Sequence, residues 1–471
     1  MTDTDICIIG AGSGGLSVAA GAAQMGARVV LIEGAEMGGD CLNHGCVPSK
    51  ALLAAAKHAH AMTDGARFGV APVVPQVDYA VAKDHVARTI AAIAPMDSQE
   101  RFEGFGVRVI RDWARFTAPD RVEAGGEVIR ARRFVIATGS RPAIPPVPGI
   151  ETVPYLTNET VFALREAPAH LLILGGGPIG IEMAQAHQRL GVPVTVIEGA
   201  RALGREDPEL AAIALAALRD EGVAIIEGVA VAQVAGQAGA ITLTLQDGRS
   251  LQGSHLLVAA GRKVALDRLD LAAAGVEANA RGVAVGADLR SVSNRRVYAI
   301  GDAAGGAQFT HLAGYHAGIV IRSALFGLPA KARTDHIPRV TFCDPELAQI
   351  GLTETEARAL HGDALQVLRW GFEHNDRAQA EGRTEGLVKV MVVKGRPVGA
   401  GICGPQAGEL IAPWALALSA KLRLSDMAGM VLPYPTLSEV SKRAAGAYFS
   451  PKLFDNPWVK RGVRLVQRIL P

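Results

Sequence analysis

Residues 5–15 read DICIIGAGSGG, a short apolar run that ends in glycines and precedes an Ala-rich helical pattern. A second apolar run, RVVLIE, follows at 28–33. A strand, a glycine turn, a helix and a second strand open a dinucleotide-binding fold. Gly10 allows the tight turn, Gly12 lets the backbone approach a pyrophosphate, and Gly15 lets the helix pack on the strand. Glu33 ends the second strand, where a carboxylate can bind a ribose hydroxyl.

The pattern recurs later in the chain. Residues 170–180 read HLLILGGGPIG, and PVTVIE follows at 193–198. Two copies predict two nucleotide sites, which is stronger evidence than a single glycine-rich turn. The second site is expected to use Gly175, Gly177, Gly180 and Glu198. An acid at this strand end favours NADH over NADPH, although Arg201 and Arg205 nearby leave NADPH open.

Length and composition suit several α/β domains. The chain has 471 residues, of which 49% are hydrophobic and 54 are glycines, as expected for parallel sheets buried between Ala-rich helices. Its five cysteines do not resemble a secreted disulfide framework. No apolar stretch is long enough to span a bilayer, and a net charge of +2 does not indicate a nucleic-acid partner. We therefore expect a soluble, cytoplasmic enzyme.

The motif at 38–50, GGDCLNHGCVPSK, predicts redox chemistry. Its Cys41 and Cys46 lie about one helical turn apart, within bridging reach of each other. Such a pair can be reduced by two electrons and then react outward as a dithiol. Two structural buried cysteines are the alternative, but the Gly-Gly lead-in and the expected cytoplasmic location argue against it.

These residues resemble the class I pyridine nucleotide-disulfide oxidoreductases, among them dihydrolipoyl dehydrogenase, glutathione reductase and mercuric reductase. The resemblance covers residues 3 to about 450. It implies FAD in the first nucleotide site, NADH or NADPH in the second, and a homodimer. It also implies that Cys46 lies against the flavin and that Cys41 exchanges with the substrate. Lys50 would pair with Glu182 near the reactive flavin nitrogen.

The same resemblance assigns further cofactor contacts. Residues 137–140, ATGS, look like the family's linking motif under the FAD, and Asp302 would bind the ribityl chain. Gly261 and Arg262 look like the motif at the nicotinamide nucleotide, although the residues that follow depart from its usual Pro-Asn ending. Besides the two glycine loops and their acids, the expected cofactor contacts are Lys50, Ala114, Thr138, Gly139, Ser140, Glu182, Gly261, Arg262, Gly301, Asp302, Gln308, Phe309, Thr310 and His311.

The order of the motifs predicts an α/β chain with two Rossmann-like dinucleotide-binding domains, for FAD and NAD(P), and a C-terminal α+β dimerisation domain. A helical stretch is expected from about Lys50 to Phe105. The predicted divisions are 1–148 for the first part of the FAD-binding domain, 149–264 for the NAD(P)-binding domain, 265–334 for the FAD-binding or central part, 335–450 for the dimerisation domain and 451–471 for a basic amphipathic tail.

The expected site departs from the family on its substrate side. Lipoamide and glutathione reductases use a His, braced by a Glu, from a His-Pro-Thr-x-x-Glu motif of the partner subunit. Here the motif begins with Tyr434 and ends with Glu439. Imidazole titrates near neutrality whereas a phenol does not, so Tyr434 is a poor base for dithiol–disulfide exchange. A tyrosine here resembles mercuric reductase, but that enzyme's C-terminal cysteine pair is missing, since no cysteine follows Cys403.

We therefore expect electrons to pass from NAD(P)H, through the flavin and the cysteine pair, to a metal ion or small oxidant. A dihydrolipoyl dehydrogenase-type disulfide reductase is the alternative. No resident metal site is expected. Within the redox loop, Asp40 replaces a common Thr and adds a negative charge beside Cys41. His44 is a possible base or metal contact, or a simple loop residue.

The C-terminal segment 451–471 carries five basic residues against the single acid Asp455. Pro457 suits a helix start, after which apolar residues such as Val459 and Val463 fall on one side. This pattern fits a helix at an anionic membrane surface or on a partner protein, or one packed on its own dimer. A third function is therefore open: a redox-responsive flavoprotein that binds a partner or membrane through its tail.

Overall fold

The first glycine motif follows a buried parallel strand, as the sequence predicts. The computed structural model describes residues 2–470. Gly10 comes directly after β1 (Thr2–Ile9) and has a φ of +106°, which favours glycine. A Cβ at Gly10 would lie 2.5 Å from the carbonyl oxygen of Ala137, and one at Gly15 would lie 1.9 Å from that of Gly10. Glycine is therefore needed both for the turn and for the close approach of the following helix.

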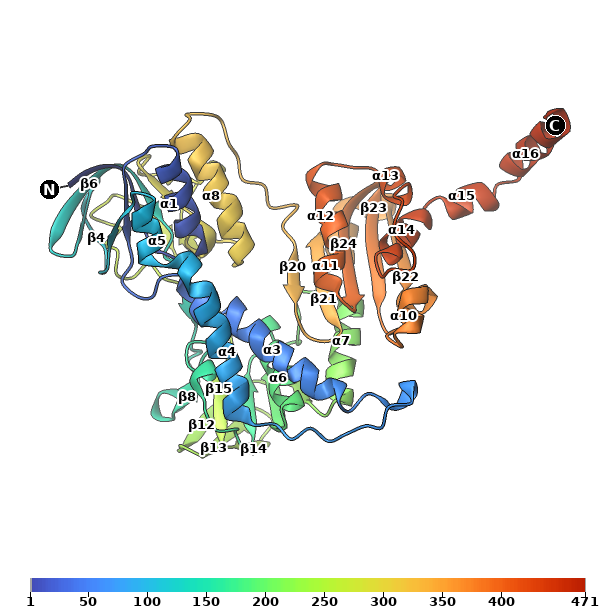
Figure 1. Ribbon diagram of the computed structural model, residues 1–471, viewed down its shortest axis with the longest axis horizontal. Helices are drawn as coiled ribbons and strands as arrows, with labels where there is room; N and C mark the ends of the chain where they lie inside the picture. Colours follow the sequence, from blue (N-terminus) through green and yellow to red (C-terminus); the bar gives the residue numbers. More distant parts are fainter. Residues whose placement is uncertain (1, 471) are drawn as a thin grey trace.

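The first sheet combines a parallel core with an antiparallel extension. Its strand order is β3-β2-β1-β6-β5-β4, and β19 pairs in parallel with the end of β6. A late segment of the chain thus returns to the sheet that the N-terminus begins. Helices α1 and α8 pack together beside this sheet (Figure 1). The elements are β1, α1 (Ser13–Gln24), β2 (Val29–Ile32), β3 (Arg108–Ile110), β4 (Arg115–Ala118), β5 (Arg121–Ala124), β6 (Glu127–Ile136), β19 (Val297–Ala299) and α8 (Thr310–Ala324).

Four short or medium helices lie between β2 and β3. They are α2 (Gly39–Asn43), α3 (Cys46–Ala61), α4 (Tyr79–Ile93) and α5 (Gln99–Gly104). The prediction of one helical stretch from Lys50 to Phe105 is wrong, because residues 62–78 form a loop with one 3-10 turn. Pro72 and Pro75 fall in this loop and cannot donate helical hydrogen bonds. Helix α4 then begins where the Asp78 side chain accepts from the amide of Val81 at 3.1 Å.

The second sheet is entirely parallel, in the order β11-β10-β9-β15-β8. A small antiparallel sheet, β12-β13-β14, lies beside it, and the two-stranded pair β7–β16 connects this part to the first sheet. The elements are β7 (Ser140–Pro142), β8 (Tyr155–Leu156), β9 (Leu171–Leu174), α6 (Pro178–Arg189), β10 (Val194–Glu198), α7 (Pro208–Asp220), β11 (Ala224–Glu227), β12 (Val231–Gln237), β13 (Ala240–Leu245), β14 (Ser250–Gly253), β15 (His255–Val258), β16 (Arg262–Val264), β17 (Ala278–Asn279) and β18 (Gly282–Val283).

The third sheet is antiparallel, in the order β20-β21-β24-β23-β22, and helices cover it (Figure 1). Its core includes the fully buried Trp414 and Phe372. The elements are β20 (Arg339–Thr341), β21 (Glu346–Gly351), α9 (Glu354–His361), β22 (Leu365–Gly371), α10 (Asp376–Ala380), β23 (Leu387–Val393), β24 (Arg396–Gly404), α11 (Ala407–Leu410), α12 (Ala412–Ser419), α13 (Leu424–Ala428) and α14 (Glu439–Gly446).

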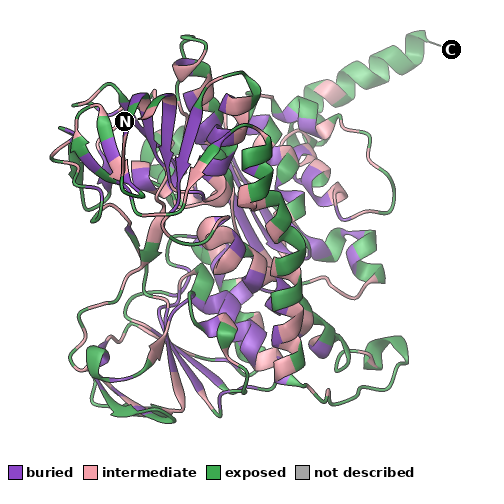
Figure 2. Ribbon diagram, turned by 60° about the vertical axis from the view of Figure 1, so that its left-hand side comes forward, coloured by how far each residue is buried: buried purple, intermediate pink, exposed green. Residues whose placement is uncertain are grey.

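Two further helices, α15 (Ser450–Phe454) and α16 (Pro457–Ile469), extend away from the third sheet (Figures 1 and 2). The three sheets are mostly buried, whereas α16 is exposed along its length (Figure 2). Across residues 2–470, no helix combines the length and apolar character needed to cross a membrane.

Candidate active site

The two redox cysteines lie on neighbouring helices that a sharp turn separates. Cys41 is in the middle of α2, and Cys46 is the first residue of α3. Gly38 and Gly39 lead into α2 with φ values of +86° and +61°, which favour glycine. Both cysteines are thiols in this structure, Cys41 half-buried and Cys46 exposed. A thiolate at Cys46 faces the positive end of α3.

The two thiols have different proton affinities. A hydrogen bond from Cys41 is the largest influence on Cys46 and lowers its pKa to about 6, although partial desolvation of the sulfur opposes this shift. Thr310, whose hydroxyl lies 3.3 Å from the Cys46 sulfur, and the charge of Lys50 lower that pKa further. The pKa of Cys41 is raised, chiefly by the same hydrogen bond. Cys46 is therefore the thiolate and Cys41 the protonated donor near neutral pH.

Lys50 and Glu182 form the ion pair that the resemblance implies. Lys50 lies one turn after Cys46 on α3, and its Nζ is 2.8 Å from Glu182 Oε2 on α6. The other carboxylate oxygen accepts from the amide of Phe342 at 2.9 Å, and Lys50 Nζ lies 4.4 Å from the centroid of the Phe342 ring. The ion pair therefore connects α3, which carries Cys46, to α6 beside the second sheet and to the end of β20 in the third sheet.

The two glycine loops are braced in the same way. Glu33 accepts from the amides of Ala11 at 2.6 Å and Ala35 at 2.7 Å. Glu198 accepts from the amides of Gly176 at 2.8 Å and Ala200 at 2.9 Å. Each acid thus fixes the loop between its two strands, and ribose binding by these acids stays a prediction. Gly12 and Gly177 both begin helices, which leaves helix amides directed at an anion.

The second loop repeats the close packing of the first. A Cβ at Gly175, which has a φ of +114°, would lie 2.5 Å from the carbonyl oxygen of Ala259, and one at Gly180 would lie 2.0 Å from that of Gly175. By contrast, a Cβ at Gly177 would contact nothing within 4 Å. This open side is where a pyrophosphate could approach the backbone.

The linking motif carries an unsatisfied polar atom that fits a bound cofactor. The hydroxyl of Thr138 is buried and has no hydrogen-bond partner, although buried polar atoms normally have one. Next to it, Gly139 has a φ of +65°, and Ser140 donates to Asp302. Burial raises the pKa of Asp302. These groups fit FAD: Thr138 and Asp302 would hold it by hydrogen bonds, with Gly10 and Gly12 at its pyrophosphate.

Arg262 connects the linking motif to the redox loop. Its Nε and Nη2 donate to the hydroxyl and carbonyl of Ser140 at 2.7 and 2.8 Å, and Nη2 lies 3.1 Å from Asp40 Oδ2. The other Asp40 oxygen accepts from Asn158 at 2.9 Å. The negative charge of Asp40 is therefore paired with Arg262 rather than left free beside Cys41. The predicted contact of Arg262 with the nicotinamide nucleotide stays a prediction, as does that of Gly261, which precedes β16.

The remaining predicted cofactor residues lie around the start of α8 or in the core. Gly301 opens a 3-10 turn, and its amide donates to His316 Nδ1 at 3.2 Å. Phe309 is the N-cap residue of α8, with Gln308 just before it, and His311 donates to the carbonyl of Pro338 at 2.8 Å. Ala114 is buried in the core of the first sheet. Of this group, within residues 2–470, only Thr310 is hydrogen-bonded to a redox cysteine.

Tyr434 and Glu439 do not meet the cysteines of the same chain. The Tyr434 hydroxyl donates to Asp376 Oδ2 at 2.9 Å, at the start of α10, and the residue is 70% exposed. The neighbouring carboxylate raises the pKa of Tyr434, which keeps the phenol protonated. Glu439 begins α14. A role for either residue at Cys41 would therefore depend on a partner subunit, as the resemblance implies.

His44 lies after α2 with its Nε2 3.5 Å from Glu36 Oε2, and its carbonyl accepts from Asn158 at 3.1 Å. His44 and Glu36 belong to no larger cluster, because residues 2–470 contain no group of three or more His, Cys, Asp or Glu side chains placed to hold a metal ion. The other cysteines, Cys7, Cys343 and Cys403, are buried, and burial raises their pKa values.

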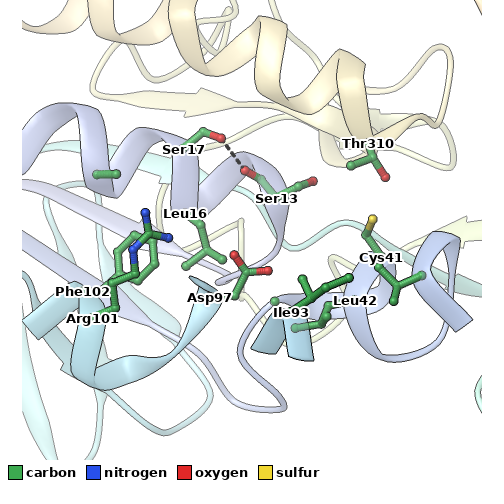
Figure 3. A pocket seen from close by; sticks show the side chains of 13 residues that line it. Ser13, Leu16, Ser17, Cys41, Leu42, Ile93, Asp97, Arg101, Phe102 and Thr310 are labelled. Atoms are coloured by element: carbon green, nitrogen blue, oxygen red, sulfur yellow. Dashed lines mark hydrogen bonds between the residues drawn. The ribbon is translucent and has the colours of Figure 1, made fainter. Parts of the chain in front are cut away.

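A pocket of about 370 Å³ opens at Cys41 (Figure 3). Cys41 and Thr310 lie at one end, and Arg101 and Phe102 lie at the other (Figure 3). Most of this wall could not be predicted from the sequence, because these residues lie outside the motifs: Leu16, Ser17, Ile93, Asp97, Arg101 and Phe102. Burial raises the pKa of Asp97.

Comparisons with known proteins agree with this geometry. The pyridine nucleotide-disulphide oxidoreductase model matches residues 4–317, and the family's dimerisation domain matches 337–445, which indicates a homodimer. A mercuric reductase of Streptomyces lividans is 33% identical over 95% of this chain and 97% of its own. A dihydrolipoyl dehydrogenase of Bacillus subtilis is 32% identical over 93% and 97%.

Among solved structures, the Cu(II) complex of the HOCl-induced flavoprotein disulfide reductase RclA from Escherichia coli has a TM-score of 0.84. It is 28% identical and covers 95% of this chain and 100% of its own. FAD and NAD(P)H are the cofactors of the proteins that share this architecture. The chain therefore belongs to the pyridine nucleotide-disulphide oxidoreductase family and is an NAD(P)H-dependent flavoprotein oxidoreductase.

Proposed function

We propose that the enzyme delivers electrons from its Cys41–Cys46 pair to a metal ion or another small oxidant. The observation that carries this proposal is the hydrogen bond from Tyr434 to Asp376, at 2.9 Å. It raises the pKa of the phenol at the position of the family's His. Disulfide exchange needs a group that takes up and returns protons near neutral pH, whereas reduction of a thiolate-bound metal ion releases no thiol that must be protonated.

The site residues have separate roles on the flavin side and on the acceptor side of the cysteine pair. When bound, FAD supplies the two-electron chemistry that connects a nicotinamide to a disulfide. Lys50, held by Glu182 at 2.8 Å, stabilises negative charge on the flavin side. Cys46 is kept as a thiolate by Cys41 and Thr310. Cys41 lines the pocket of about 370 Å³ and is placed to meet the acceptor.

The pocket and the relatives support a small acceptor. Soft thiolates bind soft metal ions well, so the two cysteines could hold such a substrate without a further ligand set. Similar proteins include mercuric reductases and a reductase solved as a Cu(II) complex. A dihydrolipoyl dehydrogenase is almost as similar, so reduction of a lipoyl-type disulfide is the second candidate function.

An acceptor screen separates these functions. We expect rapid NADH oxidation with Hg(II) or Cu(II) and slow turnover with lipoamide. Tyr434→His should raise lipoamide turnover at least about tenfold, since acid–base groups contribute two to four orders of magnitude. The matched Tyr434→Phe variant should leave metal-dependent turnover near that of the wild type. Fast lipoamide turnover by the wild type would favour the second candidate, and failure with every acceptor would favour a sensor role.

We also propose that NADH is preferred over NADPH, because the acid Glu198 ends β10 where a ribose hydroxyl would lie. Arg201 and Arg205 are exposed nearby and keep NADPH a possible donor. Finally, we propose a cytoplasmic enzyme whose segment 451–471 provides a contact surface outside the redox site.

A further inference from the structure

The apolar side chains of the C-terminal helix α16 are not buried against the rest of the chain. None of its residues is buried, and Trp458 and Ile469 are 73% and 70% exposed. The helix extends clear of the third sheet (Figures 1 and 2). Large contiguous apolar surfaces on a folded protein usually mark an interaction site. Packing on its own subunit therefore does not account for this helix.

Apolar and basic residues occupy opposite sides of α16. With about 3.6 residues per turn, one continuous side of the helix carries Trp458, Val459, Gly462, Val463, Leu465, Val466 and Ile469. The opposite side carries Lys460, Arg461, Arg464, Gln467 and Arg468. Apart from Pro457 at the first position, no residue of α16 breaks the division, and residues 457–470 contain four basic side chains and no acid. This pattern is typical of a helix that lies in a membrane interface.

Helix α15, which precedes α16, adds exposed apolar side chains to the tail and is held near the end of α14. In α15, Leu453 and Phe454 are exposed. Lys452 Nζ lies 3.3 Å from the centroid of the Tyr448 ring, which attaches the start of the tail to the end of α14. Asn456 then begins α16 by accepting from the amide of Trp458 at 2.9 Å. Helix α16 is therefore connected to the third-sheet domain through α15, whose Lys452 contacts Tyr448.

We propose that α16 docks the enzyme on an anionic lipid surface. The apolar side would enter the headgroup boundary, while the basic side chains would reach the lipid phosphates and carboxylates. A second copy of the helix offers four cations and no acid in return, so self-association would leave the charges unmatched. An anionic bilayer supplies both an apolar layer and the opposite charge. The inference deepens the proposed contact surface of 451–471 and is independent of the acceptor.

The test uses the flavin-loaded full chain and flotation with phosphatidylcholine vesicles, either pure or with about one third phosphatidylserine. Each basic residue near an anionic surface strengthens binding by about fivefold. We therefore expect at least a tenfold preference for the anionic vesicles, and we expect salt to weaken binding. Ile469→Asp and Gln467→Asp change the net charge equally but lie on opposite sides of α16.

Ile469→Asp should weaken binding at least tenfold more than Gln467→Asp, because it places a charge on the apolar side. Equal losses would overturn the amphipathic docking, as would a wild type that ignores anionic vesicles. Light scattering of a chain ending at Asn456 checks the alternative. If this chain no longer dimerises, α16 packs against the partner copy and the inference is wrong. NAD(P)H turnover is measured on the same samples, so failure of the proposed acceptor would be seen separately.

Discussion

The hydrogen bond between the two thiols should control the acidity of Cys46. The pKa of Cys46 is lowered to about 6, and the Cys41 thiol is the largest cause. Cys41→Ala removes this donor, whereas Cys41→Ser keeps a hydroxyl in its place. A hydrogen bond to a charged group contributes about 1.5–3 kcal/mol, and one pKa unit corresponds to about 1.4 kcal/mol. Because Cys46 is exposed, we take the lower limit, a rise of about one unit.

The assay is the pH dependence of iodoacetamide alkylation at Cys46, followed by mass spectrometry of the flavin-loaded protein. Only the thiolate reacts, so reactivity is lost as the pH falls through the pKa. The midpoint for Cys41→Ala should therefore lie about one unit above that for Cys41→Ser. The midpoint is the correct measure, because a thiolate of higher pKa is also a better nucleophile and raises the plateau rate.

The remaining cysteines provide internal controls. Cys7, Cys343 and Cys403 are buried and should stay unmodified in every variant. Thr310→Val tests the second donor, whose oxygen lies 3.3 Å from the Cys46 sulfur, and should give a smaller rise. If Cys41→Ala and Cys41→Ser share one midpoint, the thiol–thiol hydrogen bond does not set the acidity of Cys46, and the reasoning fails.

Three further substitutions test the surrounding contacts. Lys50→Met, which leaves the buried Glu182 without its partner at 2.8 Å, should slow flavin reduction by NAD(P)H about 100-fold in stopped flow; an unchanged rate would exclude a role for this cation. Arg262→Gln, which breaks the contacts with Asp40 and Ser140, should lower the free energy of unfolding by about 1–2 kcal/mol in thermal denaturation, and Ser140→Ala should have a smaller effect. Glu198→Gln should shift the kcat/KM ratio about tenfold from NADH toward NADPH; a constant ratio would mean that Glu198 only braces the loop through Gly176.

The features that could be predicted from the sequence are those with a local backbone or chemical requirement. Gly10 and Gly175 have positive φ values and would clash with a carbonyl oxygen if they carried a Cβ, so both nucleotide folds could be recognised from short motifs. Cys41 and Cys46 could be identified from their spacing together with the Gly-Gly lead-in at 38–39. The amphipathic character of α16 was also visible in the sequence, since a helix distributes its residues regularly. The exposure of α16 to solvent could be established only from the tertiary structure.

Tertiary structure alone decided the contacts between residues distant in sequence. Asp40 could be placed beside Cys41, but its pairing with Arg262 depends on the return of the chain through β16. Likewise, Tyr434 could be recognised as a departure, but its bond to Asp376 could not. The pocket wall around Asp97 belongs to no motif. Sequence thus determined the fold and the redox pair through local constraints. The packing of distant segments decided which residues pair with Asp40 and Tyr434 and which residues line the pocket at Cys41.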